Sequence, residues 1–137
     1  MNKKIVLDTH ALICYLKDEP GADEVENAFE KAQNKEIVLL LNVVNLAEVR
    51  YIIERRFGES AAQEFVTTLS SLPVEIVNVE KSLALLAAQI KAKTPISLGD
   101  CFCAATAMQF EASLMTGDLE FKKLEDQIDI YWLPLKS

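Results

Sequence analysis

Four carboxylates occupy positions from which they could serve a single chemical purpose. We expect each to lie at or just beyond the edge where the chain leaves the predicted sheet; they are Asp8, Glu48, Asp100 and Asp118. Like charges that are brought close together repel and raise one another's pKa unless a cation intervenes. Clustered carboxylate oxygens are ligands that Mg²⁺ and Mn²⁺ prefer. Such an ion can activate a water molecule and stabilise the oxyanions of a phosphodiester under in-line attack.

The elements that must position these acids alternate along the chain between strand and helix. Short apolar runs predict strands over residues 3–8, 36–41, 74–79, 112–115 and 128–133. Apolar periodicity predicts helices over residues 9–17, 22–33, 43–57, 60–71, 80–93 and 97–110, and a brief turn or helix over 119–124. This alternation predicts an α/β fold with helices on both faces of a mainly parallel sheet of about five strands. Ligands of such folds bind at the carboxyl edge of the sheet.

Each acid also has a structural explanation. Asp8 could cap the helix that follows the first strand, and Asp118 could cap the turn that follows it. Asp100 is the acid of a capping box that begins at Ser97. Glu48 has no capping role, and its structural alternative is an exposed acid on a helix. The four acids together favour a shared site, because the topology brings all of them to the same edge.

Composition and charge restrict the class of protein. The 137 residues are half hydrophobic and predict one domain over residues 1–137. A net charge of −7 disfavours generic nucleic-acid binding, so such a role must depend on local basic residues and on bound metal. We expect a cytoplasmic protein without membrane attachment, because the chain lacks a signal peptide and any apolar run near the roughly 20 residues of a membrane span. The three cysteines lack the spacing of a disulfide frame or a zinc site.

Four segments place the acids in a recognisable context. They read IVLDTHAL at residues 5–12, NLAEV at 45–49, SLGDCFCAATA at 97–107 and TGDLEF at 116–121. These segments resemble the four signatures of PIN domains, and most closely those of the VapC-type toxins of prokaryotic toxin–antitoxin pairs. The resemblance covers essentially the whole chain, in order and at the expected spacing. It implies a PIN-like three-layer α/β/α fold.

The resemblance also implies an activity and a ligand set. It implies a metal-dependent ribonuclease in which one or two Mg²⁺ or Mn²⁺ ions are surrounded by Asp8, Glu48, Asp100 and Asp118. Asp8 and Asp100 are then the first-choice metal ligands, and Glu48 and Asp118 complete the shell directly or through water. The implied products carry 5′-phosphate and 3′-hydroxyl ends. The implied partners are an RNA substrate, a second copy of the chain in a homodimer, and an antitoxin whose tail masks the site.

Four further residues are candidates for hydrogen-bonding the acids or for binding the substrate. Thr9 and Thr116 could hydrogen-bond the acids or a phosphate, or serve only as helix-start and strand-end residues. Asn45 lies one turn before Glu48 and could orient it. Arg55 follows Glu48 by seven residues, close to the same helix stripe, and could contact an RNA phosphate. A solvated surface position is the favoured alternative for Arg55.

The sequence departs from the family pattern at three positions. Asn42 and Asn45 stand where the family often has Ser or Thr, and His10 stands where Ser is frequent. These departures leave the acids untouched but alter the hydrogen bonds around them. His10 is the only histidine, which excludes a His-based triad or a His-rich metal site. We therefore expect His10 to pack or to hydrogen-bond rather than to catalyse.

Two other interpretations compete with the nuclease. Asp8 could be the nucleophile of a phosphatase or phosphotransferase that forms an aspartyl-phosphate. The haloacid dehalogenase-like pattern requires a second aspartate two residues later, where this chain has His10. The other alternative is a non-catalytic PIN-like protein-interaction module. Retention of all four acids favours activity, and loss of metal-dependent cleavage in Asp8→Asn would separate the two.

Overall fold

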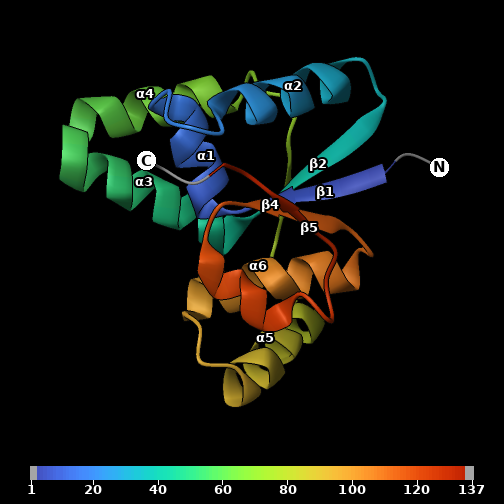
Figure 1. Cartoon of the computed structure of the whole chain (residues 1–137). Helices are drawn as coiled ribbons and strands as arrows, with labels where there is room; N and C mark the ends of the chain where they lie inside the picture. The colour runs from blue at the N-terminus through green and yellow to red at the C-terminus, as the bar shows by residue number, and fades with distance from the viewer. Residues whose placement is uncertain (1–2, 135–137) are drawn as a thin grey trace.

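A computed structural model describes residues 3–134 as five strands and the helices around them (Figure 1). The strands are β1 (Lys3–Leu7), β2 (Ile37–Asn42), β3 (Glu75–Val77), β4 (Ser113–Thr116) and β5 (Ile130–Trp132). The helices are α1 (Thr9–Leu16), α2 (Ala22–Gln33), α3 (Val43–Phe57), α4 (Glu59–Leu69), α5 (Lys81–Lys93), α6 (Leu98–Gln109) and the 3₁₀ helix η1 (Leu119–Leu124). The expected domain over residues 1–137 includes residues 1, 2 and 135–137, which lie outside the described part of the chain.

The five strands form one parallel sheet in the order β3-β2-β1-β4-β5. This confirms the predicted fold class. The predicted strands over 74–79 and 128–133 were too long, because β3 and β5 are the edge strands. Each of them pairs with a single neighbour, so its ladder ends sooner than its apolar run does.

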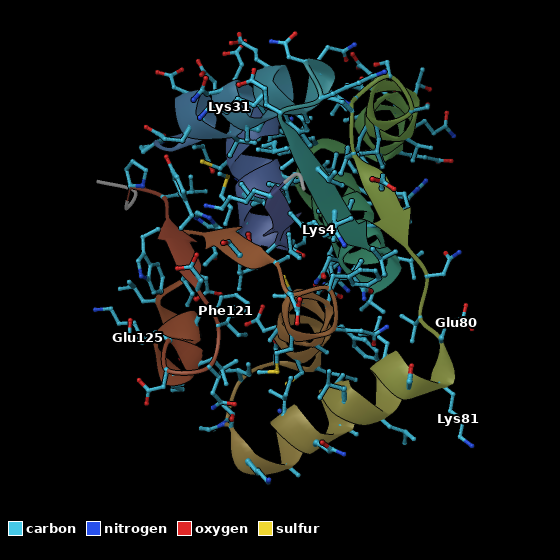
Figure 2. All side chains as sticks on the ribbon, turned by 90° about the vertical axis from the view of Figure 1, so that its right-hand side faces the viewer. Lys4, Lys31, Glu80, Lys81, Phe121 and Glu125 are labelled. Carbon is cyan, nitrogen blue, oxygen red and sulfur yellow. The ribbon has the colours of Figure 1, made fainter. Side chains whose placement is uncertain are left out.

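Two hydrophobic cores lie on the two faces of the sheet. Alternate residues of β1 point to opposite faces, so Ile5 and Leu7 pack in one core and Val6 packs in the other. Helices α1 to α4 cover the first core, and α5, α6 and η1 cover the second (Figure 1). Figure 2 shows the same layers from the side, with Lys31 of α2 and Lys81 of α5 on their outer surfaces. The result is the predicted three-layer arrangement.

Parallel pairing brings the carboxyl ends of the central strands to one edge, where the next helices begin. Asp8 caps α1 by accepting from the Ala11 backbone N–H at 2.7 Å. Asn42 caps α3 by accepting from the Val44 N–H at 2.8 Å, and its amide donates to Thr106 Oγ1 of α6 at 2.9 Å. This buried link fixes α6 beside the end of β2. The Asp8 cap was predicted from residue type, and Asn42 is also of a type that favours this position.

Small side chains allow α6 to lie close against the sheet. Its fully buried positions include Cys101, Cys103, Ala104 and Ala105. Burial raises the pKa of the Cys101 and Cys103 thiols, which keeps them protonated and suits small packing residues. Within residues 3–134, no helix combines the length and apolar character that crossing a membrane requires.

Candidate active site

Asp8 is the most enclosed of the four acids, with 2% of its surface exposed. One carboxylate oxygen caps α1, and the other accepts from Thr116 Oγ1 at 2.5 Å. Burial raises the pKa of Asp8 to about 7, against the opposing effect of these two hydrogen bonds. The nearby charges of Asp100 and Asp118 raise it further. A group in this setting is costly to ionise unless a cation compensates for the lost hydration.

The turn after β4 connects Asp118 to Asp8 through one hydroxyl. Thr116 Oγ1 donates to Asp8 and accepts from the Asp118 backbone N–H at 2.9 Å. The Asp118 side chain then caps η1 by accepting from the Glu120 N–H at 3.0 Å. Because the capping bond uses Oδ1 of Asp118, its Oδ2 remains available for another ligand.

His10 fixes the other side of this turn. Its Nδ1 accepts from the Gly117 N–H at 3.2 Å. A Cβ at position 117 would come within 2.5 Å of the imidazole ring, so glycine is required for the close approach. This bears out the expected hydrogen-bonding role of His10. It also assigns the ring proton to Nε2, since Nδ1 acts as the acceptor.

Glu48 is held by three different helices. Its Oε1 accepts from Thr9 Oγ1 of α1 and from Asn45 Nδ2 one turn earlier in α3, both at 2.9 Å. The same Asn45 amide donates to the Gly99 carbonyl of α6 at 3.1 Å. The carboxylate lies directly over Gly99, where a Cβ would overlap both carboxylate oxygens. The sequence suggested that Asn45 could orient Glu48, but it gave no sign of the Gly99 seat, which depends on how α3 and α6 pack.

Asp100 lies half-buried in the first turn of α6. Its backbone N–H donates to Ser97 Oγ at 3.1 Å, as one half of the predicted capping box. Burial raises the pKa of Asp100 to about 6, and the charges of Asp118, Glu48 and Glu120 add to the effect. Asp100 therefore lies within electrostatic reach of the other three predicted acids.

Glu120 is an additional acid that sequence reasoning missed. Its charge raises the pKa of Asp100, and its carboxylate pairs with Lys123 at 2.8 Å. Lys123 also donates to the Pro95 carbonyl at 3.2 Å, which ties η1 to the loop before α6. The available signal was the position of Glu120 two residues after Asp118 in the last signature segment.

Thr9, Asn45 and Thr116 all contact the acids through hydrogen bonds, as their sequence positions suggested. Arg55 does not belong to this network. It is exposed about two turns further along α3 from Glu48, with its guanidinium carbon 5.0 Å from the centre of the Tyr51 ring.

The donor set fits a hard divalent cation. It consists of carboxylate oxygens, which such cations prefer. Two of the acids, Asp8 and Asp100, have a pKa that is raised by burial and by the charges of neighbouring acids. Within residues 3–134, no three Asp, Glu, His or Cys side chains already converge tightly enough to hold an ion. Mutually repelling carboxylates are expected to stay apart until a cation lies between them. The chemistry of the residues therefore fits Mg²⁺ or Mn²⁺.

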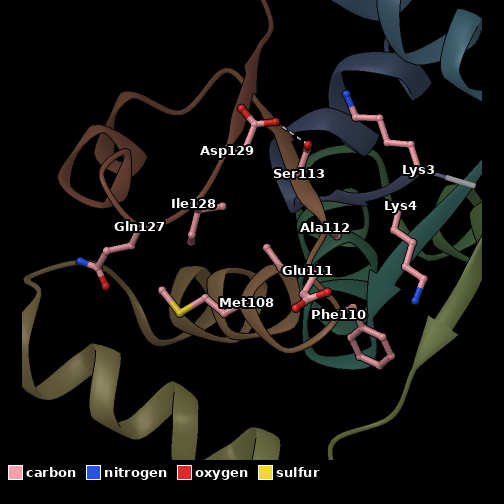
Figure 3. Close-up of a pocket in the computed structure, with 11 residues that line it drawn as sticks. Lys3, Lys4, Met108, Phe110, Glu111, Ala112, Ser113, Gln127, Ile128 and Asp129 are labelled. Carbon is pink, nitrogen blue, oxygen red and sulfur yellow. Dashed lines mark hydrogen bonds between the residues drawn. The ribbon is translucent and has the colours of Figure 1, made fainter. Parts of the chain in front are cut away.

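A hollow also exists at the opposite edge of the sheet, where β1 and β4 begin (Figure 3). Lys3 and Lys4 lie on one side of it, and Ser113 donates to Asp129 at 2.7 Å on the other. None of the four predicted acids lines this hollow. The acidic cluster and this concave surface are therefore separate features.

Comparisons with known proteins show which family of sequences the chain resembles. The family model described as PIN domain matches residues 5–127. Ribonuclease VapC30 of Mycobacterium tuberculosis is 30% identical over 105 residues, which cover 72% of this chain and 77% of that protein. Ribonuclease VapC of Mycolicibacterium smegmatis is 30% identical over 75% of this chain and 82% of its own length.

A solved structure shares the fold at lower sequence identity. A chain of VapBC2 from Rickettsia felis, crystallised with a DNA fragment from its promoter, superposes with a TM-score of 0.75. The match is 18% identical and covers 96% of this chain and 99% of that one.

The Gly99 seat generates a first prediction. Gly99→Ala should displace the Glu48 carboxylate and lower the free energy of unfolding by about 1–3 kcal/mol, the usual effect of overpacking. In a Glu48→Ala background the same change should be neutral or slightly stabilising, because alanine favours helix over glycine. Denaturant unfolding of the four proteins measures the difference. Equal effects in the two backgrounds would contradict the close contact.

The raised pKa values of Asp8 and Asp100 generate a second prediction. The folded state holds these protons to higher pH than the unfolded chain, so the free energy of unfolding should fall as pH rises from about 4 to about 7 in EDTA. For Asp8 the effect should be on the order of 2–4 kcal/mol. Asp8→Asn should flatten the slope. An unchanged slope in Asp8→Asn would show that its pKa is not raised.

Proposed function

Because this chain belongs to the PIN domain family, we propose that it is a divalent-metal-dependent endoribonuclease and the toxin of a toxin–antitoxin pair. The observation that carries the proposal is the electrostatically coupled cluster of Asp8, Glu48, Asp100 and Asp118 at the carboxyl edge of the sheet. RNA is the proposed substrate because the relatives that match most of the chain are named ribonucleases.

Asp8 and Asp100 are the proposed direct ligands of Mg²⁺ or Mn²⁺, with Glu48 and Asp118 completing the shell directly or through water. When bound, one or two such ions supply positive charge that lowers the pKa of an attacking water and stabilises the oxyanions of the phosphodiester. The raised pKa values of Asp8 and Asp100 support this assignment, since a cation is the partner that their ionised forms lack.

The protein's own side chains hold the ligands in place. Among the described residues, hydrogen bonds engage Oε1 of Glu48 and Oδ1 of Asp118 and leave the other oxygen of each acid available. Thr9 and Asn45 fix Glu48 from two helices, so little of its side-chain freedom remains to be lost on binding. Thr116 keeps Asp8 and the Asp118 backbone in one arrangement.

The proposed reaction is hydrolysis at phosphorus. Water attacks in line and the 3′-oxygen leaves, so the products carry 5′-phosphate and 3′-hydroxyl ends. No 2′-hydroxyl is consumed, which makes single-stranded DNA an informative second substrate.

The proposed partners are an antitoxin and a second copy of this chain. The net charge of −7 and the acidic site favour a partner of opposite charge. We propose that a basic segment of the antitoxin covers the carboxyl edge of the sheet. The structural neighbours include VapBC toxin–antitoxin assemblies, which supports an antitoxin partner. The proposed homodimer is what the family resemblance implies.

Cleavage of a structured RNA pool by the purified protein tests the proposed function. We expect cleavage with Mg²⁺ or Mn²⁺ and none with EDTA. Asp100→Asn should reduce the rate by about 100-fold or more, the usual loss when a charge-stabilising group is removed. Ligation to the 5′ ends of the products reports the predicted 5′-phosphate.

Asp129→Asn, at the opposite edge of the sheet, is the matched control and should cut at the parental rate. Cleavage that persists in EDTA or in Asp100→Asn would contradict the proposal. If the protein shows neither cleavage nor metal binding, a PIN-like protein-interaction module remains as its function.

A further inference from the structure

A stripe of side chains leads away from Glu48 along the exposed face of α3. Tyr51 follows Glu48 by three residues and Arg55 follows it by seven, so the three lie on one side of the helix. They are displaced from Glu48 by roughly 5 and 10 Å along the axis. Val49 and Ile53 form the buried stripe of the same helix, and Glu48 lies at its margin. Any polymer that reaches Glu48 from this side must pass over Tyr51 and Arg55.

Tyr51 and Arg55 are accessible and preassembled. Tyr51 is 45% exposed, and the Arg55 guanidinium lies over its ring at 5.0 Å. Within residues 3–134, Arg55 has no ion-pair partner, whereas Arg50 pairs with Glu54 and Arg56 lies 3.9 Å from Glu19. The Arg55 charge is therefore available to an anionic ligand on the surface of a chain whose net charge is −7.

This pair of side chains has the chemistry of a nucleotide-binding surface. An aromatic ring stacks on a base of any sequence, and a guanidinium binds phosphate while stacking on the ring. Stacked nucleotides rise by about 3.4 Å per residue in one strand, so the stripe spans about three nucleotides from the acids. Because the rest of the protein is acidic, local cations are needed to hold a polyanion near the site.

We propose that Tyr51 and Arg55 form a subsite for unpaired RNA next to the scissile phosphate. Tyr51 stacks on a base and Arg55 binds a backbone phosphate on the same strand. The inference rests on the proposed ribonuclease function and extends it by naming the part of the substrate that α3 contacts. Both residues act in substrate binding and neither is assigned a role in the chemical step.

The same helix supplies matched controls. Phe57 is 46% exposed and also carries cations on its ring, with Lys17 Nζ at 3.6 Å and the Arg56 guanidinium at 5.1 Å. Phe57 follows Glu48 by nine residues, or about two and a half turns, so it lies on the other side of the buried stripe from Glu48. Phe57→Leu and Arg56→Gln therefore remove the same kinds of group from outside the proposed path.

The first experiment measures binding. Fluorescence polarisation with a labelled uridine nonamer and an abasic nonamer of equal length is carried out at low salt with Mg²⁺, in an Asp100→Asn background that prevents cleavage. Tyr51→Leu should weaken binding of the uridine nonamer about tenfold and leave the abasic nonamer unaffected. Arg55→Gln should weaken binding of both and reduce the slope of log affinity against log salt by about one.

The second experiment measures kinetics in the parental chain. Tyr51→Leu should raise KM about tenfold with little change in kcat, because the contact is present equally in the bound and transition states. Tyr51→Phe should retain the parental KM, because the aromatic ring is kept. Phe57→Leu and Arg56→Gln should retain both the parental KM and the parental affinities.

The outcomes separate this inference from the proposed function. Metal-dependent cleavage with KM and affinity unchanged in Tyr51→Leu would overturn the subsite and leave the nuclease intact. Base-dependent binding through Tyr51 without any cleavage would support the subsite and reject the nuclease. Absence of affinity for either nonamer would overturn the subsite. Unchanged affinity in Tyr51→Leu together with an altered molecular mass in light scattering would also overturn it, and would assign the stripe to a protein contact.

Discussion

Burial, reinforced by mutual repulsion, makes the carboxylates at one edge of the parallel sheet costly to ionise, and this is the main electrostatic constraint in the structure. Because β1, β2 and β4 pair in parallel, their carboxyl ends lie at the same edge of the sheet, and the acids that follow them are brought together there. Burial of Asp8 raises the pKa of its carboxyl to about 7, so the apo arrangement is electrostatically unfavourable. The hydrogen bonds from Thr116, Thr9 and Asn45 stabilise the acids but do not neutralise them.

The capping roles of these acids are compatible with their proposed roles as metal ligands. Asp8 and Asp118 each use one oxygen to cap a helix, and the cap fixes where the other oxygen lies. A helix N-terminus also carries partial positive charge, which favours an acid there over one on a loop. The sequence patterns that suggest an ordinary helix cap are therefore part of the machinery that positions the site.

The parts of the structure that follow from local chemistry could be predicted from the sequence. The bounds of α3 and η1, the caps at Asp8 and Asn42, and the shared edge of the four acids follow from apolar periodicity and residue type. The seat of Glu48 on Gly99 could not be predicted, because it depends on the packing of α3 against α6, 51 residues apart in the chain. The exposed pairing of Tyr51 with Arg55 has the spacing of an ordinary helix and becomes informative only beside the site.

Calorimetric titration with Mn²⁺ near pH 6.5 tests whether the acidic cluster is a divalent cation site. Because Asp8 and Asp100 hold protons that a metal must displace, the account predicts saturable binding with proton release, seen as a heat that depends on the ionisation enthalpy of the buffer. Asp8→Asn should weaken binding and reduce the protons released. Absence of saturable binding, or binding that Asp8→Asn leaves unchanged, would contradict the account.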